Sequence, residues 1–459
     1  MTQGHVAVID IGKTNAKLAL VNLADLSEIA VVTRPNIVLP GPPWPHFDVD
    51  GHWDFLLEAL TRFHAEHGID AISITTHGAC VALLDAHGDL AAPILDYEHS
   101  GPDDLAEDYD RLRPEFSETG SPRLGMGLNV GAQLHWQFAT DPGLKARTET
   151  ILTYPQYWGA RLTGVTAADV SSLGCHTDLW DPRARGFSSL VDTLGIADKL
   201  APARPSADVL GPILPEIAAR TGLAPDTPVH CGIHDSNASL LPHLLGNPRP
   251  FSVISSGTWV IVMSVGGQEV DLDPSRDTLI NTDAFGNPVP SARFMGGREH
   301  DLASGGTYPE PTEADIAAVL SGGVMLLPAV VPETGPFRGQ DAHWCGAEPE
   351  VGTGVRGAAV AFYLALVTAR CLDLIGHDGP ILVEGPFARN RCYGRMLSVA
   401  TGSPVRAMHG STGTSQGAAL LAGPAPTDTA SAGTAPGAPA VPTAAEQAYI
   451  TDWNARSGP

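Results

Sequence analysis

Residues 228–241 read PVHCGIHDSNASLL, a pattern typical of a buried strand, a sharp turn and the first turn of a helix. Asp235 stands at that turn. Residues 251–263, FSVISSGTWVIVM, follow soon after and form two apolar β-type runs around a polar tip that contains Gly257. An aspartate at the start of a helix is most often an N-cap and nothing more. The rest of the chain therefore decides whether Asp235 has a chemical role.

A second hairpin pattern occurs near the start of the chain, where residues 6–21 read VAVIDIGKTNAKLALV. Gly12, Lys13 and Thr14 suggest a P-loop, but Ala7 stands where its first glycine is required and a strand follows instead of a helix. A plain hairpin is the alternative. Because the strand, polar tip and strand pattern recurs around Gly257, we expect a duplicated domain with two loops facing each other across a cleft.

Length and composition restrict the class of protein. A chain of 459 residues is expected to form two domains. Its formal net charge of -24 argues against a nucleic-acid partner. The six cysteines contain no C-x-x-C pair, which indicates reduced thiols in a cytoplasmic protein. No secretory signal and no 18-residue apolar run is found, so we expect no membrane contact, and a homodimer is the default assembly.

Predicted strands alternate with predicted helices, which indicates an α/β fold. Residues 423–443 are almost wholly Pro, Ala, Thr, Gly and Ser and predict a linker, followed by a short helix over 444–456. The other helices are predicted at 50–63, 130–138, 154–162, 355–375, 396–401 and 414–422, the other strands at 71–75, 81–85, 323–328 and 380–384, and loops at 40–45 and 202–215.

The order and spacing of several motifs resemble the FGGY carbohydrate kinases, and most closely their rhamnulokinase and fuculokinase group. The motifs are IDIG at 9–12, SITTHG at 73–78, VALLD at 81–85, LDYE at 95–98, LTG at 162–164, GIHD at 232–235, SSGTW at 255–259, Asn390, and GSPV at 402–405. The resemblance implies two duplicated actin-like (ribonuclease H-like) domains. These would be a sugar-binding domain at 1–245 and a nucleotide-binding domain at 246–423, with 424–459 as linker and terminal helix.

The resemblance also implies an ATP-dependent sugar kinase. A sugar hydroxyl is a poor nucleophile, so a carboxylate must accept its proton as phosphorus is attacked; by resemblance this base is Asp235. Asp10 is expected to hold Mg²⁺ through water. The residues expected at the phosphates and ATP are Gly12, Lys13, Thr14, Asn15, Gly257, Thr258, Gly385 and Asn390, and those expected at the sugar are His77, Gly78, Tyr97, Glu98, His234 and Asp235.

The chain departs from the family pattern at three places. Lys13 replaces a small residue and is either a phosphate contact or a solvated lysine. His77-Gly78 and Glu98-His99 replace Trp-Gly and Arg-Asp in the sugar site, and Pro386-Phe387 interrupts the glycines of the adenosine motif. The acceptor is therefore open between L-rhamnulose, L-fuculose or a similar ketose and another polyol or a sugar acid. A non-catalytic member of the same fold is the further alternative.

Overall fold

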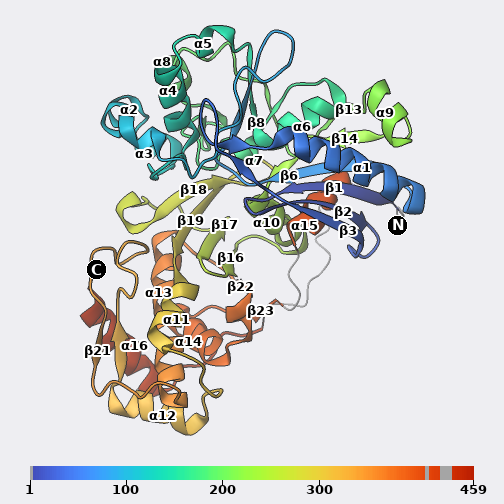
Figure 1. Ribbon diagram of the computed structural model, residues 1–459. Coiled ribbons are helices and arrows are strands. Elements are labelled where there is room, and N and C mark those ends of the chain that lie inside the picture. The colour runs from blue at the N-terminus through green and yellow to red at the C-terminus, as the bar shows by residue number, and fades with distance from the viewer. Residues whose placement is uncertain (1–3, 409–412, 424–436, 459) are drawn as a thin grey trace. The chain divides into compact units, whose positions relative to one another are not determined.

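The computed structural model describes residues 4–408, 413–423 and 437–458, which form two compact units (Figure 1). The first contains residues 4–245, 280–288 and 413–423, and the second contains 246–279, 289–408 and 437–458. The chain first passes from one unit to the other between residues 245 and 246. The helix predicted at 414–422 nevertheless belongs to the first unit, so the division is not linear along the chain.

The first unit is built on a seven-stranded sheet whose main path has the order β13-β14-β6-β1-β2-β3, with β15 pairing beside β6. Its long hairpin, β1 and β2, is antiparallel, whereas β1 and β6 are parallel. The strands are β1 (His5–Ile11), β2 (Asn15–Asn22), β3 (Glu28–Pro35), β6 (Ala71–Thr76), β13 (Val209–Pro212), β14 (Pro228–His230) and β15 (Ile233–His234).

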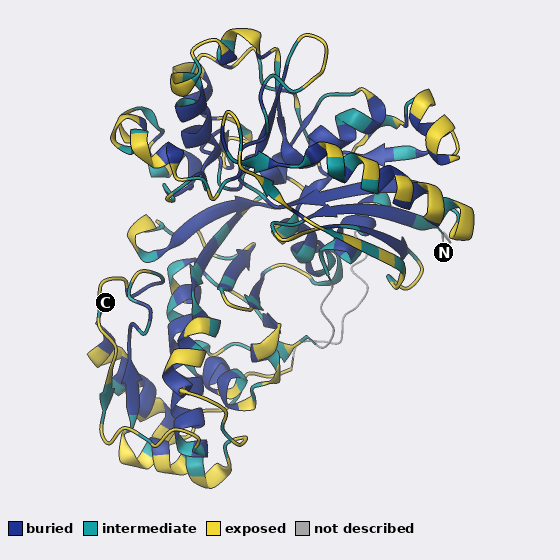
Figure 2. Cartoon of the chain, in the orientation of Figure 1, coloured by how far each residue is buried: buried dark blue, intermediate teal, exposed yellow. Residues whose placement is uncertain are grey.

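The two faces of this sheet follow from the alternation of side chains along its strands. In β1, Ile9 and Ile11 pack into the main hydrophobic core with helix α1 (Val49–His67), as do Ile72 and Ile74 of β6. Asp10, between the two isoleucines of β1, and Ser73, between those of β6, face helix α15 (Thr414–Ala419) on the other side of the sheet (Figure 1). Figure 2 shows the central strands β1 and β6 as buried, whereas α1 carries both buried and exposed residues. One face therefore supplies packing, and the other brings α15 to the sheet.

The remaining elements of the first unit surround this sheet. They are α2 (Ala106–Leu112), α3 (Phe116–Thr119), α4 (Val130–Thr140), α5 (Leu144–Arg147), α6 (Tyr154–Thr163), α7 (Val170–Leu173), α8 (Leu190–Thr193), α9 (Pro215–Thr221), α10 (Asp235–Gly246), the 3-10 turns η1 (Gly101–Leu105) and η4 (Leu420–Ala422), and the short strands β4 (Val38–Leu39), β5 (His46–Phe47), β7 (Val81–Leu84), β8 (Thr150–Thr153), β9 (Ala168–Asp169), β10 (Trp180–Asp181), β11 (Gly186–Phe187) and β12 (Ala203–Arg204).

The second unit has a six-stranded sheet in the order β18-β19-β17-β16-β22-β23. Its strands are β16 (Phe251–Ser256), β17 (Val260–Val265), β18 (Thr278–Thr282), β19 (Pro288–Phe294), β22 (Ile381–Glu384) and β23 (Val405–Ala407). The other elements are α11 (Gly296–Ser304), α12 (Glu313–Gly322), α13 (Gly354–Leu374), α14 (Arg391–Thr401), α16 (Ala444–Ser457), η2 (Pro274–Arg276), η3 (Pro386–Arg389), β20 (Met325–Leu327) and β21 (His343–Cys345).

The two sheets share one topology, which confirms the predicted duplication and the α/β class. The order β14-β6-β1-β2-β3 in the first unit corresponds to β23-β22-β16-β17-β19 in the second. Strand directions correspond too. The hairpins β1-β2 and β16-β17 are antiparallel, and each pairs in parallel with the next strand, β6 or β22. The recurring hairpin seen in the sequence is thus the centre of each sheet.

Two predicted element boundaries were wrong. The stretch 202–215, predicted as a loop because of its prolines, contains β12 and the edge strand β13, where Pro212 is tolerated. Helix α14 begins at Arg391, five residues before the predicted start, because the Asn390 side chain caps it.

Within the described residues, α13 alone is long and apolar enough to cross a membrane, and most of its apolar stretch is buried in the second unit.

Candidate functional site

Three strand ends of the first unit meet at one edge of its sheet. The parallel register places Ile11 of β1 beside Thr76 of β6, and Thr76 beside His234 of β15. The next residues, Gly12, His77 and Asp235, therefore leave the sheet together. The carboxyl ends of parallel strands are where open α/β sheets bind ligands, so this edge is the candidate acceptor site.

Asp235 is fixed at the point where β15 passes into α10. Its Oδ1 accepts a hydrogen bond from the Ser236 backbone N–H at 2.6 Å and lies 3.2 Å from His234 Nε2. The turn before it depends on Gly232, which has φ of 94° and would place a Cβ 2.7 Å from the Ile74 carbonyl oxygen. With its side chain 31% exposed, the carboxylate is oriented and open to a substrate.

His234 lies buried behind Asp235. Burial by itself would lower the pKa of His234, but Cys175 and the Asp235 carboxylate outweigh it and raise that pKa to about 9. A Cβ on Gly78 would come within 2.7 Å of His234 Nε2, so only glycine leaves room for this ring. Gly78 and His234 therefore orient Asp235; that they also touch the sugar remains a prediction.

His77 is held in an aromatic box formed by Phe47, Tyr97 and Tyr154, with ring centroids 5.0–5.2 Å from its own. Its Nδ1 donates to the Gly78 carbonyl oxygen at 3.0 Å, because a carbonyl can only accept. Burial lowers the pKa of His77 to about 4, so the ring is neutral. Its Nε2 is then a buried acceptor without a partner in the described chain, which suits a sugar hydroxyl.

The side chain of Lys13 is not free in solvent. It extends away from the turn at residues 12–15 toward the loop that contains Asp96. Its Nζ contacts Asp96 Oδ1 and lies 3.1 Å from Glu98 Oε2, while the ring centroid of Tyr97 is 4.7 Å away. The side chain is 23% exposed. The solvated alternative is therefore wrong, and Lys13 joins the predicted sugar residues Tyr97 and Glu98.

The turn of Gly12, Lys13, Thr14 and Asn15 is closed by a hydrogen bond from Gly12 N–H to the Asn15 carbonyl oxygen at 2.9 Å. Asn36 fixes it from outside: its backbone N–H donates to Thr14 O and its Nδ2 donates to Gly12 O, both at 2.8 Å. Because the Gly12 N–H closes the turn, the N–H groups of Lys13 and Thr14 are the ones that remain for an anion.

A chain of buried polar groups supports Asn36, and we call Arg34, Asn36, Asp48 and His52 the Asn36 network. Arg34 Nη1 donates to His52 Nδ1 at 2.8 Å, so the other ring nitrogen, Nε2, carries the hydrogen and donates to Asn36 Oδ1 at 2.8 Å. Asp48 pairs with Arg34. Burial lowers the pKa of His52 to about 4, in agreement with a neutral ring.

Asp10 is the residue expected to hold Mg²⁺. Its Oδ2 accepts hydrogen bonds from Thr414 Oγ1 at 2.7 Å and Ser415 Oγ at 2.9 Å, and Lys17 Nζ lies 3.2 Å away. The described residues contain no group of three metal-ligating side chains. A single oriented carboxylate fits Mg²⁺, which keeps most of its waters and takes one or two protein carboxylates.

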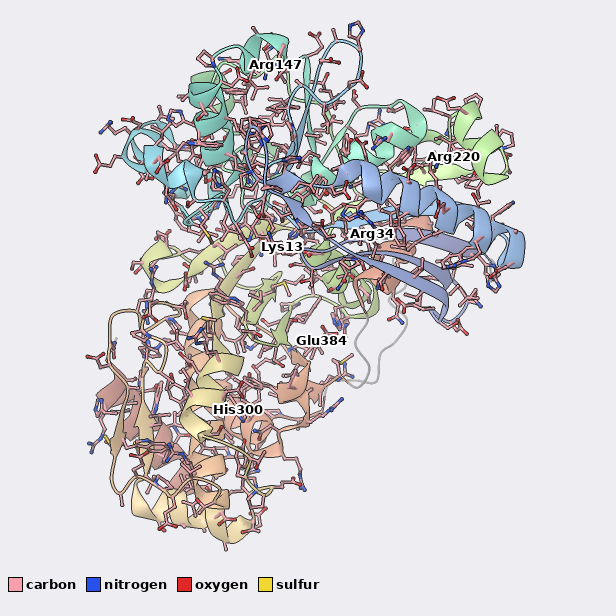
Figure 3. All side chains as sticks on the ribbon, viewed as in Figure 1. Lys13, Arg34, Arg147, Arg220, His300 and Glu384 are labelled. Carbon is pink, nitrogen blue, oxygen red and sulfur yellow. The ribbon has the colours of Figure 1, made fainter. Side chains whose placement is uncertain are left out.

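The second unit contains a cavity of about 950 Å³ at the tip of its own hairpin. Gly257, Thr258 and Asn390, all predicted at the nucleotide, line it. His300, Tyr308 and Phe387 form an aromatic wall, and His300 Nε2 lies 2.9 Å from Tyr308 Oη. The cavity also contains Arg298, Arg389 and Arg391, which suit the phosphates of a nucleotide. Figure 3 labels Lys13 and Arg34 in the first unit and His300 and Glu384 in the second.

Gly385 does not line this cavity; it lies against Ser256 and allows the turn that carries Pro386 and Phe387. Its φ is 76°, and a Cβ there would lie 1.9 Å from the Ser256 carbonyl oxygen, so glycine is required. Ser256 Oγ donates to Glu384 O and accepts from Phe387 N–H. Asn390 serves chiefly as the cap of α14, accepting from Tyr393 N–H at 3.0 Å. The Pro386-Phe387 departure is thus accommodated by a specific backbone turn.

Sequence reasoning missed several of these residues. Thr414 and Ser415 reach Asp10 from the far end of the chain, and Asn36 and His52 carry no motif. Arg389, Arg391 and Asp96 were open to detection, because the arginines flank Asn390, Asp96 lies in the LDYE motif, and each has the charge that a phosphate or Lys13 requires. Arg298 lies near no motif.

Two family models match the chain. The N-terminal domain of the FGGY family of carbohydrate kinases matches residues 5–242, and the FGGY C-terminal domain matches residues 248–431. The chain belongs to the FGGY family of carbohydrate kinases. L-fuculokinase of Escherichia coli K12 is 28% identical over 287 residues, 59% of this chain and 58% of that protein. Autoinducer-2 kinase of Enterobacter is 23% identical, over 82% of this chain and 77% of that protein.

Solved structures agree with the family assignment. A carbohydrate kinase from Novosphingobium aromaticivorans is 39% identical, with a TM-score of 0.83 over 91% of this chain and 93% of that one. A xylulose kinase from Rhodospirillum rubrum has a TM-score of 0.76 over 98% of both chains at 22% identity, which shows the fold alone. The chain spans 58% of the length of the fuculokinase it matches.

Replacing Asn36 tests whether its network serves the turn at Gly12. In Asn36→Ala the N–H of His52 and the carbonyl of Gly12 lose buried partners, which costs about 1–3 kcal/mol of stability. We expect the KM for ATP to rise about tenfold, since the turn loses its support, with a smaller effect on the acceptor KM. Asn22→Ala, at an exposed turn of the same unit, is the control. An unchanged ATP KM in a destabilised Asn36→Ala protein would limit the network to folding.

Glu299 provides a pH test of the second unit. It is 2% exposed on α11, accepts from Tyr363 Oη at 2.9 Å and from Val331 N–H at 3.2 Å, and burial raises its pKa from 4.5 to about 7. A raised folded-state pKa gives stability that is complete below pH 4.5 and is lost as the pH rises through about 7. Glu299→Gln, which stays neutral, should match the wild-type Tm near pH 5 and exceed it at pH 8. The gain should be on the order of 2–3 kcal/mol. Glu269→Gln, at an exposed position, should show no such divergence between the two pH values.

Proposed function

We propose that the chain transfers the γ-phosphoryl group of ATP to a hydroxyl of a ketose, with Asp235 as the general base. The observation that carries this proposal is the position of Asp235: an oriented, partly exposed carboxylate at the strand edge where Gly12 and His77 also emerge. Family membership supports phosphoryl transfer to a carbohydrate. A deoxyketose resembling L-fuculose or L-rhamnulose is favoured, since L-fuculokinases are among the relatives.

The chemistry divides between the two units. In the first, His77 Nε2 and the Glu98 carboxylate accept hydrogen bonds from acceptor hydroxyls, while Asp235 takes the proton of the attacking one. In the second, Gly257, Thr258 and the three cavity arginines bind the phosphates, and His300, Tyr308 and Phe387 bind the base. Mg²⁺ would be held by Asp10 through water, and when bound it would neutralise charge on the phosphates.

The reducing cytoplasm suits this protein as the place of action. All six cysteines are free, and five of them are buried. The sequence-based predictions of a homodimer and of no nucleic-acid or membrane partner stand beside the proposal as predictions.

A coupled ADP-release assay tests the reaction. The acceptors are L-fuculose, L-rhamnulose, D-xylulose, glycerol and gluconate, each with Mg²⁺-ATP. We expect turnover with at least one ketose and the highest kcat/KM with a deoxyketose. ATP binding without stimulation by any acceptor would instead support the non-catalytic alternative, and a preference for gluconate would support a sugar-acid kinase.

Substitution of the proposed base tests the mechanism. Asp235→Asn keeps the size of the side chain but cannot accept the proton, so kcat should fall by about 10²–10⁴-fold. The folded protein and its ATP affinity should persist, as measured by thermal unfolding and calorimetry. Asp226→Asn, at an exposed loop position in the same unit, should behave as wild type. Wild-type turnover in Asp235→Asn would refute the assignment of the base.

A further inference from the structure

Lys13 combines a backbone in one part of the site with a side chain in another. Its main chain belongs to the turn between β1 and β2, beside the glycine expected at the phosphates. Its ammonium group instead lies at the loop that carries Asp96, Tyr97 and Glu98. The backbone of Lys13 therefore indicates a phosphate as ligand, whereas its ammonium group indicates the acceptor.

Two carboxylates and two aromatic rings hold the ammonium group at that loop. It contacts Asp96 Oδ1, lies 3.1 Å from Glu98 Oε2, and faces the rings of Tyr97 and Phe47 at 4.7 and 5.3 Å. Cation–π contacts at this range add to the attraction of the carboxylates. Turning toward a phosphate would leave Asp96, whose side chain is 9% exposed, without its cation.

Asp96 is itself rigid, so it defines where Lys13 is held. Its backbone N–H donates to Pro45 O at 3.0 Å, and its Oδ1 accepts from Glu98 N–H at 3.2 Å. Glu98, in contrast, is 55% exposed and keeps lone pairs available. An ammonium group has three N–H donors; one of them is hydrogen-bonded to Asp96, and Glu98 is held as an ion pair at 3.1 Å. Lys13 therefore keeps donors, and Glu98 keeps acceptors, beside each other.

The neighbouring groups complete a surface for hydroxyls. The Tyr97 ring packs against His77 at 5.2 Å, and His77 Nε2 is an acceptor without a partner in the described residues. Among the described residues, the charges acting on this surface are mainly negative, from Asp96, Glu98 and Asp235, and Lys13 and His234 oppose them. Such a balance disfavours an anionic acceptor and leaves both donors and acceptors for an uncharged one.

We propose that Lys13 is a specificity residue of the acceptor pocket. Together with Glu98 it binds two adjacent hydroxyls of an uncharged polyol, and it does not bind the phosphates of the nucleotide. Lys13 donates to one hydroxyl oxygen, and Glu98 accepts from the neighbouring hydroxyl. This proposal rests on the proposed kinase function and names the class of substrate that the site takes.

Lys13→Met separates the two roles. We expect the KM for L-fuculose and for D-xylulose to rise about 10- to 100-fold, the effect of losing a charge-assisted hydrogen bond. The KM and calorimetric Kd for ATP should stay within about twofold, as is typical of a site that the substitution does not touch. Glu98→Gln should show the same pattern, and the double variant should lose less than the sum of the two singles, because the residues act as a pair.

Lys199→Met is the matched control, since Lys199 is a partly buried lysine of the same unit that donates to a single carbonyl, Thr148 O. A rise in the ATP KM or Kd of Lys13→Met with an unchanged sugar KM would overturn the proposal and make Lys13 a phosphate ligand. If Lys13→Met does not fold, Glu98→Gln carries the same test. If the wild-type protein shows no turnover with any of the acceptors, the kinase proposal is refuted separately. ATP calorimetry on Lys13→Met then still decides whether Lys13 binds the nucleotide.

Discussion

The parallel pairing of β1, β6 and β15 is the constraint on which the first unit depends. It places Ile11, Thr76 and His234 in line, so that the residues after them leave the sheet at one edge. The backbone hydrogen bonds between the strands set the spacing of the three strand ends, so this spacing does not depend on contacts between the loops. Gly232 makes this pairing possible by letting the chain pass close to Ile74 before β15 begins. The Asp235 carboxylate, the neutral His77 ring and the turn at Gly12 are thereby brought together by strand register.

Duplication supplies the same framework twice, and the two copies have diverged in what surrounds the hairpin. In the first unit the tip is supported by Asn36 and lies near carboxylates and an aromatic box. In the second, Gly385 allows η3 to pack against Ser256, and arginines and aromatic rings gather at the cavity. The backbone topology is conserved between the copies, whereas the surrounding side chains differ: carboxylates of Asp96, Glu98 and Asp235 in the first unit, and Arg298, Arg389 and Arg391 beside Asp301 and Glu310 in the second.

Local patterns predicted the parts of the molecule that local interactions determine. The two hairpins, the helix starting at Asp235 and the long apolar helix α13 were all readable, since alternation and helical periodicity are properties of neighbouring residues. The family resemblance then predicted roles for Asp235, Asp10 and His77. What could not be read were contacts between distant segments. Nothing in the sequence near Asp10 indicates Thr414, and nothing near Gly12 indicates that His52 supports it through Asn36. The environment of Lys13 was missed for the same reason.

The position of α15 has a consequence for biosynthesis. Thr414 and Ser415 bind Asp10, Ser73 Oγ donates to Ala418 O, and Gly417 packs so closely on Ala238 that a Cβ would overlap its carbonyl oxygen. One face of the first sheet therefore stays open until the ribosome has made more than four hundred residues. At about 5–20 residues per second, the first unit to emerge waits through the synthesis of the second before Asp10 acquires its hydrogen-bond partners. The order of translation thus keeps the first unit incomplete until the second has been made.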